Sequence, residues 1–383
     1  MASDFRRDRL TWVAYAALAW FAFLQAAPGL VIVHLREELD LSYAVGGLHV
    51  AAFASGCVVA GLVAARIERA VGRRRMFWTA AALLAAATVG LTAGRAVTLT
   101  VGSVLLMGFT GGLLLVTIQA ALADRHGEHR TIALVEANLA AGVAYVVLIG
   151  ALSLAAALGA GWRVALLASL VVPVLAWWAG RREAIDAPPP PPAAQGRLPG
   201  PFWVAAAVLF CATSAEWCIA AWGATFVEDA AGTSSDTAVA LMAGYFGGVV
   251  VGRLLGSALA RRYDPARLMA VALAVSAAGF AVLWPATAPA PALVGLVLLG
   301  LGLGNLFPMG VSVAVSLAPD RSALASGQVV TTGSAAVLVA PLVVGALADA
   351  ASLRAALGVV PVALVLAAAG LAHVARTRSA AKS

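Results

Sequence analysis

Charged residues are scarce in this chain of 383 residues, of which 11% are Asp, Glu, Lys or Arg and 62% are hydrophobic. A soluble domain carries about 25% charged residues, so this scarcity excludes a protein that is surrounded by water on all sides. Lysine is almost absent, since Lys382 is the only one. A Walker-type phosphate loop needs a lysine after its glycines, so ATP-driven transport by this chain itself is excluded as well.

Cysteine and histidine are also sparse. The three cysteines, Cys57, Cys211 and Cys218, fall in apolar stretches and lack the spacing of a metal site or of a disulfide framework. The sequence has no helical His-x3-His pair and no acidic metal cluster. We therefore expect no metal, no cofactor and no enzymatic activity. The net charge of +7 would suggest nucleic acid as the partner of a soluble protein, but the apolar composition argues against such a partner here.

Long apolar stretches dominate what is present. A helix of about 20 apolar residues crosses the hydrocarbon core of a bilayer, and stretches of this kind predict twelve membrane spans. The first one is too long for the core of a signal peptide, so we expect it to be retained as a helix. The expected spans are residues 11–34, 43–65, 76–94, 97–122, 131–157, 162–180, 201–226, 238–260, 267–286, 290–317, 323–348 and 354–374.

A proline-rich segment divides these spans into two groups of six. It contains the run Pro188–Pro192, and a polyproline stretch extends rather than packs. The sequence therefore predicts an N-terminal six-helix bundle over residues 1–180, a cytoplasmic linker over residues 181–200 and a C-terminal six-helix bundle over residues 201–383.

The basic residues predict how the chain is oriented in the membrane. With the N-terminus inside, cytoplasmic segments hold 20 of the 25 Lys and Arg residues, the opposite side holds four, and Arg253 lies within a span. Cytoplasmic loops of membrane proteins carry an excess of Lys and Arg. We therefore expect both termini to lie in the cytoplasm.

Matching residues recur at a nearly constant offset. Gln25 and Glu216, deep in the first and seventh spans, are 191 positions apart, as are Arg163 and Arg354, which open the sixth and twelfth spans. Matches at equivalent topological positions indicate a duplicated six-helix unit. Because six is even, both copies cross the membrane in the same direction, which is the parallel repeat of a two-bundle transporter.

The segment after the second span carries a family motif. It reads Gly61-Leu-Val-Ala-Ala-Arg66-Ile-Glu68-Arg69-Ala-Val-Gly72-Arg73-Arg74-Arg75. This is similar to the cytoplasmic loop signature of the major facilitator superfamily, in which a glycine, an acid and a basic residue precede Gly-Arg-Arg. The family usually has aspartate where Ala65 stands, and Glu68 is offset from that position. Gly161-Trp162-Arg163, before the sixth span, is another frequent feature of the family.

The resemblance covers essentially the whole chain. It implies an all-α membrane protein with twelve transmembrane helices in two pseudo-symmetric six-helix bundles, working by alternating access as a monomer in a bacterial plasma (inner) membrane. The fifth span lacks the proline of the drug/proton antiporter signature, whereas Glu216-Trp217 and Gly252-Arg253 look more like the branch with sugar-type permeases.

Three charged residues lie well inside spans, namely Glu136, Glu216 and Arg253. A charge in hydrocarbon costs about 2.5–3.5 kcal/mol on insertion scales, so these are functional candidates. Glu136 and Arg253 lie about 9 and 12 Å from the cytoplasmic ends of spans five and eight, which the resemblance implies face each other. We predict that they pair as a gate between the bundles. The alternative is that Arg253 snorkels to the headgroups and that Glu136 joins a polar cluster with Asn138.

Glu216 is the first candidate for carrying protons, and Glu136 is the second. Desolvation favours the protonated form of a carboxyl group, which suits a group that loads a proton on one side and releases it on the other. The alternative for Glu216 is a permanently protonated group that bonds a neighbouring helix. Further polar and aromatic residues at suitable depth predict a substrate cavity: Gln25, Gln119, Asn138, Trp217, Trp222, Asn305 and Gln328.

These observations predict a secondary transporter for a small organic molecule, coupled to protons. Because the candidate cavity residues are few and mostly neutral, efflux of a partly apolar molecule is the first hypothesis. Uptake of a sugar or similar nutrient is the second, and a membrane sensor or scaffold without turnover is the third. The intramembrane charges argue against the scaffold, which has no need to bear their cost.

Overall fold

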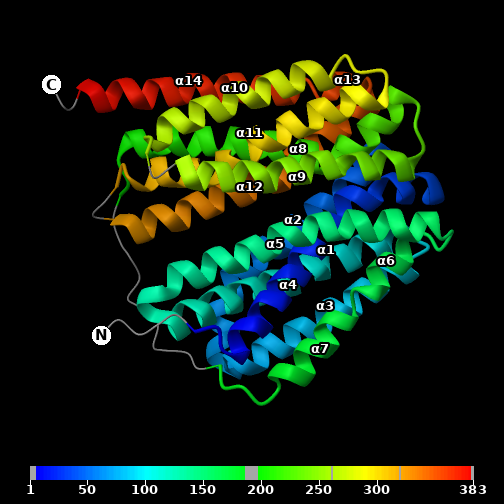
Figure 1. Ribbon diagram of the computed structural model, residues 1–383, viewed down its shortest axis with the longest axis vertical. Helices are drawn as coiled ribbons and strands as arrows, with labels where there is room; N and C mark the ends of the chain where they lie inside the picture. The colour runs from blue at the N-terminus through cyan, green and yellow to red at the C-terminus, as the bar shows by residue number, and fades with distance from the viewer. Residues whose placement is uncertain (1–5, 186–196, 260–261, 319–320, 381–383) are drawn as a thin grey trace. The chain divides into compact units, whose positions relative to one another are not determined.

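The computed structural model describes residues 6–185, 197–259, 262–318 and 321–380, whose regular structure is helical, without a strand. Figure 1 shows helices running side by side within each part of the chain. The helices are α1 (Arg9–Leu39), α2 (Tyr43–Val71), α3 (Arg73–Ala93), α4 (Val97–His126), the short 3-10 helix η1 (Gly127–His129), α5 (Arg130–Ala157), α6 (Trp162–Ala168), α7 (Val171–Gly180), α8 (Gly200–Ala231), α9 (Ser235–Leu259), α10 (Pro265–Leu283), α11 (Pro289–Val315), α12 (Ser322–Ala350), α13 (Leu353–Ala356) and α14 (Val359–Ala380).

Twelve helical segments of the described residues are long and apolar enough to cross a membrane, which confirms the predicted number of spans. Two spans consist of two helices each, because α6 with α7 forms the sixth and α13 with α14 forms the twelfth. Some helices outrun their expected ends. The second was expected to stop at residue 65 but continues to Val71, and it ends only at Gly72, whose φ of 82° is a conformation that glycine favours.

The chain divides into two units. The first comprises residues 1–34 and 52–191, and the second comprises residues 35–51 and 192–383. The end of α1 and the start of α2 are thus grouped with the second unit. Much of the predicted linker (residues 181–200) lies outside the described residues, which omit 186–196, and the predicted domain boundaries stay a prediction.

Hydrogen bonds explain this grouping of the turn between α1 and α2. The carboxylate of Asp349, near the end of α12, accepts from the backbone amides of Tyr43 and Ala44 at 2.7 Å each. It thereby caps the start of α2, whose first amides have no partner in the helix. The Tyr43 hydroxyl donates to Asp229 of α8 at 2.8 Å, and the guanidinium carbon of Arg36 lies 3.5 Å from the centre of the Tyr43 ring.

Each unit contains the same close helix crossing. In the first unit, a Cβ on Gly108 of α4 would lie 1.9 Å from the carbonyl oxygen of Phe53 in α2. In the second, a Cβ on Gly300 of α11 would lie 2.0 Å from the carbonyl oxygen of Tyr245 in α9. Each residue stands 192 positions from its counterpart. Small residues let membrane helices approach closely, and here the same approach is built twice from matching positions.

The repeated arginines make matching contacts as well. Arg163 donates from Nε to the carbonyl oxygen of Thr92, in the last turn of α3, at 2.9 Å. Arg354 donates to the carbonyl oxygen of Trp284, directly after α10, at 3.0 Å. The last carbonyls of a helix have no partner within it, so both arginines satisfy the end of the third span of their half.

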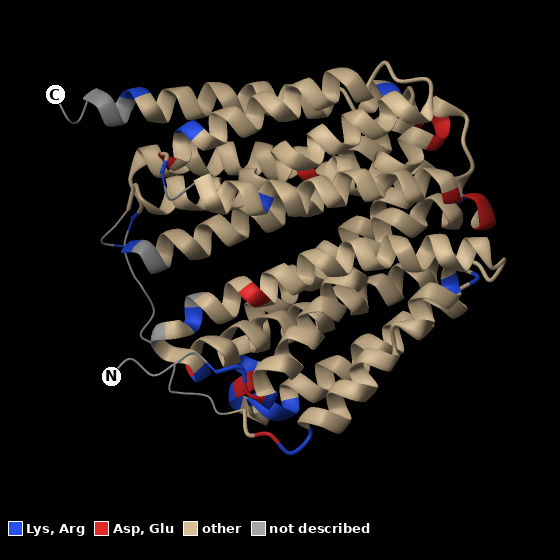
Figure 2. Ribbon diagram, in the orientation of Figure 1, with Lys and Arg blue, Asp and Glu red and all other residues tan. Residues whose placement is uncertain are grey.

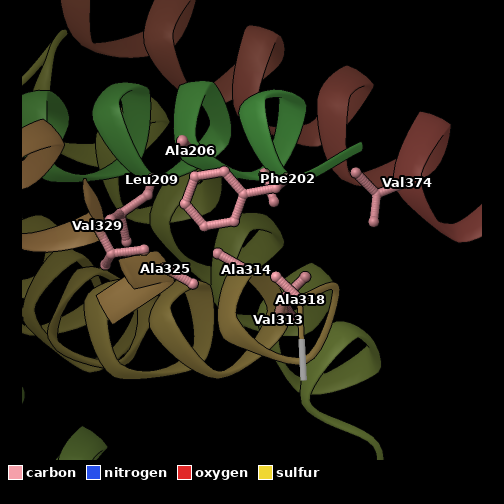
Figure 3. Close-up of a cluster of buried hydrophobic side chains, with 10 residues drawn as sticks. Phe202, Ala206, Leu209, Val313, Ala314, Ala318, Ala325, Val329 and Val374 are labelled. Atoms are coloured by element: carbon pink, nitrogen blue, oxygen red, sulfur yellow. The ribbon is translucent and has the colours of Figure 1, made fainter. Parts of the chain in front are cut away.

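The second unit has an apolar core where α8, α11, α12 and α14 meet (Figure 3). Phe202 and Leu209 of α8 are fully buried and pack with Ala314 of α11, Val329 of α12 and Val374 of α14. Lipid tails are as apolar as these side chains, so the gain comes from close packing rather than from leaving water. This core fixes the first half of α8, the helix that carries Glu216.

The close crossing of α2 and α4 predicts that one added methyl group destabilises the protein at Gly108 but not at Gly102, where α4 has open space beside it. Gly108→Ala forces α2 and α4 apart, and overpacking of this kind costs about 1–3 kcal/mol, so we expect a lower melting temperature in detergent. Gly102→Ala is the matched control on the same helix, because a Cβ there meets nothing within 4 Å. An unchanged melting temperature for Gly108→Ala would show that the crossing is looser than described.

Candidate transport site

Glu216 lies halfway along α8 and therefore near the middle of a membrane span. α8 has Pro201 in its first turn and ends before Gly232, which has a φ of 60°; both residues are typical of those helix positions. The Glu216 side chain is 14% exposed. Within the described part of the chain, its carboxylate has one partner, Arg253 of α9.

Arg253 meets this carboxylate inside the membrane span. Its Nη2 lies 3.7 Å from Oε1 of Glu216, and its Nε donates to the carbonyl oxygen of Gly304 at 3.2 Å. Arg253 is six residues, about 9 Å, from the end of α9. A Cβ on Gly252 would meet Leu301 and one on Gly256 would meet Asn305, so Arg253 lies level with the residues of α11 just before Gly304.

Neighbouring helices hold this ion pair in place. A Cβ on Gly256 of α9 would lie 2.0 Å from Oδ1 of Asn305, so α9 and α11 are in direct contact about one turn after Arg253. Asn305 is buried, and its amide donates to a carbonyl oxygen of its own helix. The hydroxyl of Tyr245 donates to the backbone carbonyl oxygen of Glu216 at 3.1 Å, which fastens α9 to α8 beside the carboxylate.

Glu136, in the first unit, is bound by groups near the start of the chain. Arg7 donates to both of its carboxylate oxygens, at 2.8 and 2.5 Å, in a two-pronged geometry that is among the stronger hydrogen-bonded pairs. The Tyr15 hydroxyl donates to the same carboxylate at 3.1 Å. Asn138 donates to the carbonyl oxygen of its own helix. The predicted pairing of Glu136 with Arg253 would join the two units and stays a prediction.

A second ion pair lies beside this one. Asp8 accepts from Arg125 at 2.6 Å and from the hydroxyl and amide of Thr11 at 2.6 and 2.9 Å. The Thr11 hydroxyl also lies 2.8 Å from Nε2 of His126. Partial burial by itself would raise the pKa of Asp8, but these hydrogen bonds outweigh it and lower that pKa below its usual value. The start of α1 is thus fastened to the end of α4.

The loop signature forms a compact charge network at the ends of α2, α3 and α4. Arg73, whose side chain is 6% exposed, donates to Glu68 and to Asp124 at 2.7 Å each. Glu68 therefore supplies the acid although Ala65 stands at the usual family position. Arg74 donates to the backbone of Arg181, after α7. The other signature residues Gly61, Arg66, Arg69 and Gly72 are exposed.

The remaining cavity candidates lie in varied surroundings. Gln25 is half-buried and accepts from the Tyr145 hydroxyl at 3.1 Å, within the first unit. Trp222 is buried, and its indole donates to the carbonyl oxygen of Pro341. Gln119 is exposed, whereas Trp217 and Gln328 are half-buried. Among the described residues, no group of three or more His, Cys, Asp or Glu is placed to hold a metal.

Sequence reasoning missed most of the partners of these residues. It paired Glu216 with no cation, although Arg253 was already a candidate, because helix periodicity does not tell which faces of α8 and α9 meet. From the sequence, Arg7 was only one of the basic residues that predict the cytoplasmic side, and not a partner of Glu136. A carboxylate six residues into a span, with an arginine just before another span, was the signal that could have paired Glu136 with Arg7.

The geometry defines a multi-pass membrane protein, whose described helices are nearly free of charge between their ends (Figure 2) and hold the Glu216–Arg253 ion pair in mid-span. The family model of the Major Facilitator Superfamily matches residues 11–234 and residues 205–383. The chain belongs to this family. It is therefore a transporter rather than an enzyme, and the resemblance inferred from the sequence is confirmed.

Solved structures share the fold across nearly the whole chain. A bacterial homolog of the human lysosomal transporter Spinster, inward-facing and occupied, has a TM-score of 0.76 at 14% identity, covering 97% of this chain and 98% of its own. The nucleoside transporter NupG (D323A mutant) has 0.74 at 10%, covering 96% and 99%. A D-xylose–proton symporter has 0.70 at 14%, covering 94% and 96%. A comparison with curated proteins gave no match in sequence.

The charge network of the loop signature predicts different roles for two neighbouring arginines. Arg73→Gln leaves Glu68 and Asp124 without their shared cation, and we expect it to lower the free energy of unfolding by about 2–3 kcal/mol, between the values for exposed and buried pairs. Arg75→Gln is the matched control, because Arg75 is exposed and outside that network. Thermal unfolding in detergent measures both. Equal effects would contradict a special role for Arg73.

Proposed function

We propose that the protein moves a small organic molecule across the membrane by alternating access and couples this movement to protons at Glu216. One observation supports this most strongly: a carboxylate in mid-span whose single described partner is a half-exposed arginine. Ionisable groups in membrane spans are costly and mark ion or substrate pathways. One contact of 3.7 Å holds this pair, so a proton bound at Glu216 is enough to rearrange it. A fully hydrogen-bonded pair would resist such a rearrangement.

The coupling step follows from the charges of the pair. When Glu216 is ionised, it neutralises Arg253; when it takes a proton, Arg253 keeps its positive charge and loses its attraction to α8. Protonation therefore changes both the contact between α8 and α9 and the charge that a substrate meets. A transporter needs this kind of differential interaction between its states, since a ligand shifts an equilibrium only by its difference in affinity.

Orientation and location complete the proposal. The distribution of arginines supports cytoplasmic termini, and we place the protein in a bacterial plasma (inner) membrane as a monomer. Efflux is the direction that we propose first, because the candidate cavity residues are mostly neutral. Uptake of a polar nutrient is the second candidate, since a sugar–proton symporter and a nucleoside transporter share the fold.

Flux measurements in proteoliposomes test proton coupling. We expect an imposed pH gradient to drive substrate flux in the wild-type protein, and Glu216→Gln to abolish this dependence, because the amide cannot exchange a proton. Glu216→Asp is the matched control, since it keeps a titratable group at the same place. Flux that follows the pH gradient in Glu216→Gln would remove Glu216 as the proton carrier. Ligand-dependent thermal stabilisation without flux would favour a sensor.

Glu136 is the second proton candidate, and we also propose that it pairs with Arg253 in another state of the cycle. The charge-swap variant Glu136→Arg with Arg253→Glu tests this pairing. An arginine at position 136 would face Arg7, and a glutamate at position 253 would face Glu216. The swap and the single variants are therefore made together with Arg7→Gln and Glu216→Gln, and the variant with these two changes alone is the control. We expect the swap to recover part of the transport that each single variant loses. No recovery would count against the gate.

A further inference from the structure

The guanidinium of Arg253 has more donors than its surroundings use. An arginine carries five N–H groups, and in the described residues only Nε donates a hydrogen bond, to Gly304. The 3.7 Å between Nη2 and Glu216 makes an ion pair without a hydrogen bond. The Arg253 side chain is 40% exposed, in contrast to 14% for Glu216. The terminal N–H groups of the fork therefore remain open to a ligand.

The shape of these donors selects a class of ligand. The planar fork of a guanidinium matches a carboxylate or a phosphate with two parallel hydrogen bonds. A neutral sugar or nucleoside needs no formal cation, and placing one in a membrane span is costly. Because Nη2 of Arg253 lies 3.7 Å from the carboxylate of Glu216, halfway along α8, its fork lies inside the span and not at the headgroups, which makes an anionic substrate the simplest explanation of this residue.

Charge balance then ties the anion to a proton. An anion that joins the ionised pair adds a net negative charge in a medium of low dielectric, where unpaired charge is expensive. A proton on Glu216 removes this penalty and frees Arg253 for the anion. The two ligands therefore favour each other's binding by the same factor, as linkage requires, and the neutral combination of anion and proton crosses together.

Few other charged groups face the pair. α11 carries no ionisable residue, and α12 carries Asp349 next to its far end, where it caps α2. α13 carries Arg354, and the second half of α14 carries His373, Arg376 and Arg378. α9 itself contributes Tyr245, whose hydroxyl is held by a backbone carbonyl, and Asp236 in its first turn. α8 contributes the thiols of Cys211 and Cys218 and, near its far end, Glu228 and Asp229. Glu216 and Arg253 thus determine the local charge.

We propose that the substrate is a small organic anion whose carboxylate binds the fork of Arg253 and travels in the same direction as a proton bound at Glu216. This rests on the proposed function and specifies its substrate class and the sense of its coupling. Efflux then means that an organic acid leaves the cell down its own gradient with a proton. Uptake means that an inward proton gradient draws the acid in.

Thermal unfolding of the purified full-length protein tests this with matched probes. Benzoate, acetate, lactate and succinate are each compared with the corresponding primary amide, which keeps the shape and lacks the charge. We expect at least one carboxylate to raise the melting temperature of the wild-type protein and its amide to leave it unchanged. We expect the carboxylate's affinity to fall about tenfold for each pH unit above the titration of Glu216, because one proton binds with each anion.

Variants separate binding from folding. Arg253→Gln combined with Glu216→Gln removes the cation without leaving an unpaired charge, and we expect it to fold and to lose the response to carboxylates. Glu216→Gln alone mimics the protonated state, so it should bind the carboxylate with an affinity that no longer depends on pH. The proposal is overturned if no carboxylate stabilises the protein, if an amide stabilises it equally, or if the double variant responds like the wild type.

Flux distinguishes this inference from the proposed function. The stabilising carboxylate is added to proteoliposomes that enclose a pH-sensitive dye, with protein-free liposomes correcting for diffusion of the acid. Co-transport predicts that internal acidification accompanies carboxylate entry and is lost in the double variant. Binding of the carboxylate without flux would contradict the proposed transport function and still support the anion site. Proton-coupled flux of neutral compounds alone would leave the transport function and remove the anion site.

Discussion

The cost of charge in hydrocarbon governs how this chain is built. Each uncompensated charge in a span costs about 2.5–3.5 kcal/mol or more, and the chain accordingly gathers most of its arginines at helix ends. Arg253 is the exception that the structure makes tolerable, because a carboxylate and a backbone carbonyl meet it in mid-span. The same cost makes the pair sensitive to protonation, because a proton on Glu216 leaves the positive charge of Arg253 to be neutralised by another group.

Close helix packing positions this pair. The Gly300–Tyr245 crossing brings α11 onto α9, and the Tyr245 hydroxyl reaches the backbone of Glu216. The first unit repeats the crossing with Gly108 and Phe53, yet its helices carry Gln25 at the position that corresponds to Glu216. Duplication thus supplies two similar scaffolds, and two side chains, Glu216 in place of Gln25 and Arg253 in place of Gly61, put the ion pair in one of them.

Sequence alone was sufficient for the features that depend on composition and period. Twelve spans, the duplication and the family follow from apolar length, repeated positions and the loop signature, and all are confirmed. The pairing of charged side chains was harder to predict from the sequence. Arg73 pairs with Glu68, which is offset from the usual family position, and with Asp124 of α4. The contact of Glu216 with Arg253 depends on the rotation of two helices, which apolar residues on all faces leave unspecified.

The protonation state of Glu216 is the most direct test of the account. Infrared difference spectroscopy in lipid membranes detects the carbonyl stretch of a protonated carboxyl group, and Glu216→Gln identifies the band that belongs to this residue. The account predicts a band that appears as the pH falls and that changes its titration when Arg253 is replaced by Gln. A Glu216 that keeps one protonation state at every accessible pH, or that ignores the loss of Arg253, would contradict it.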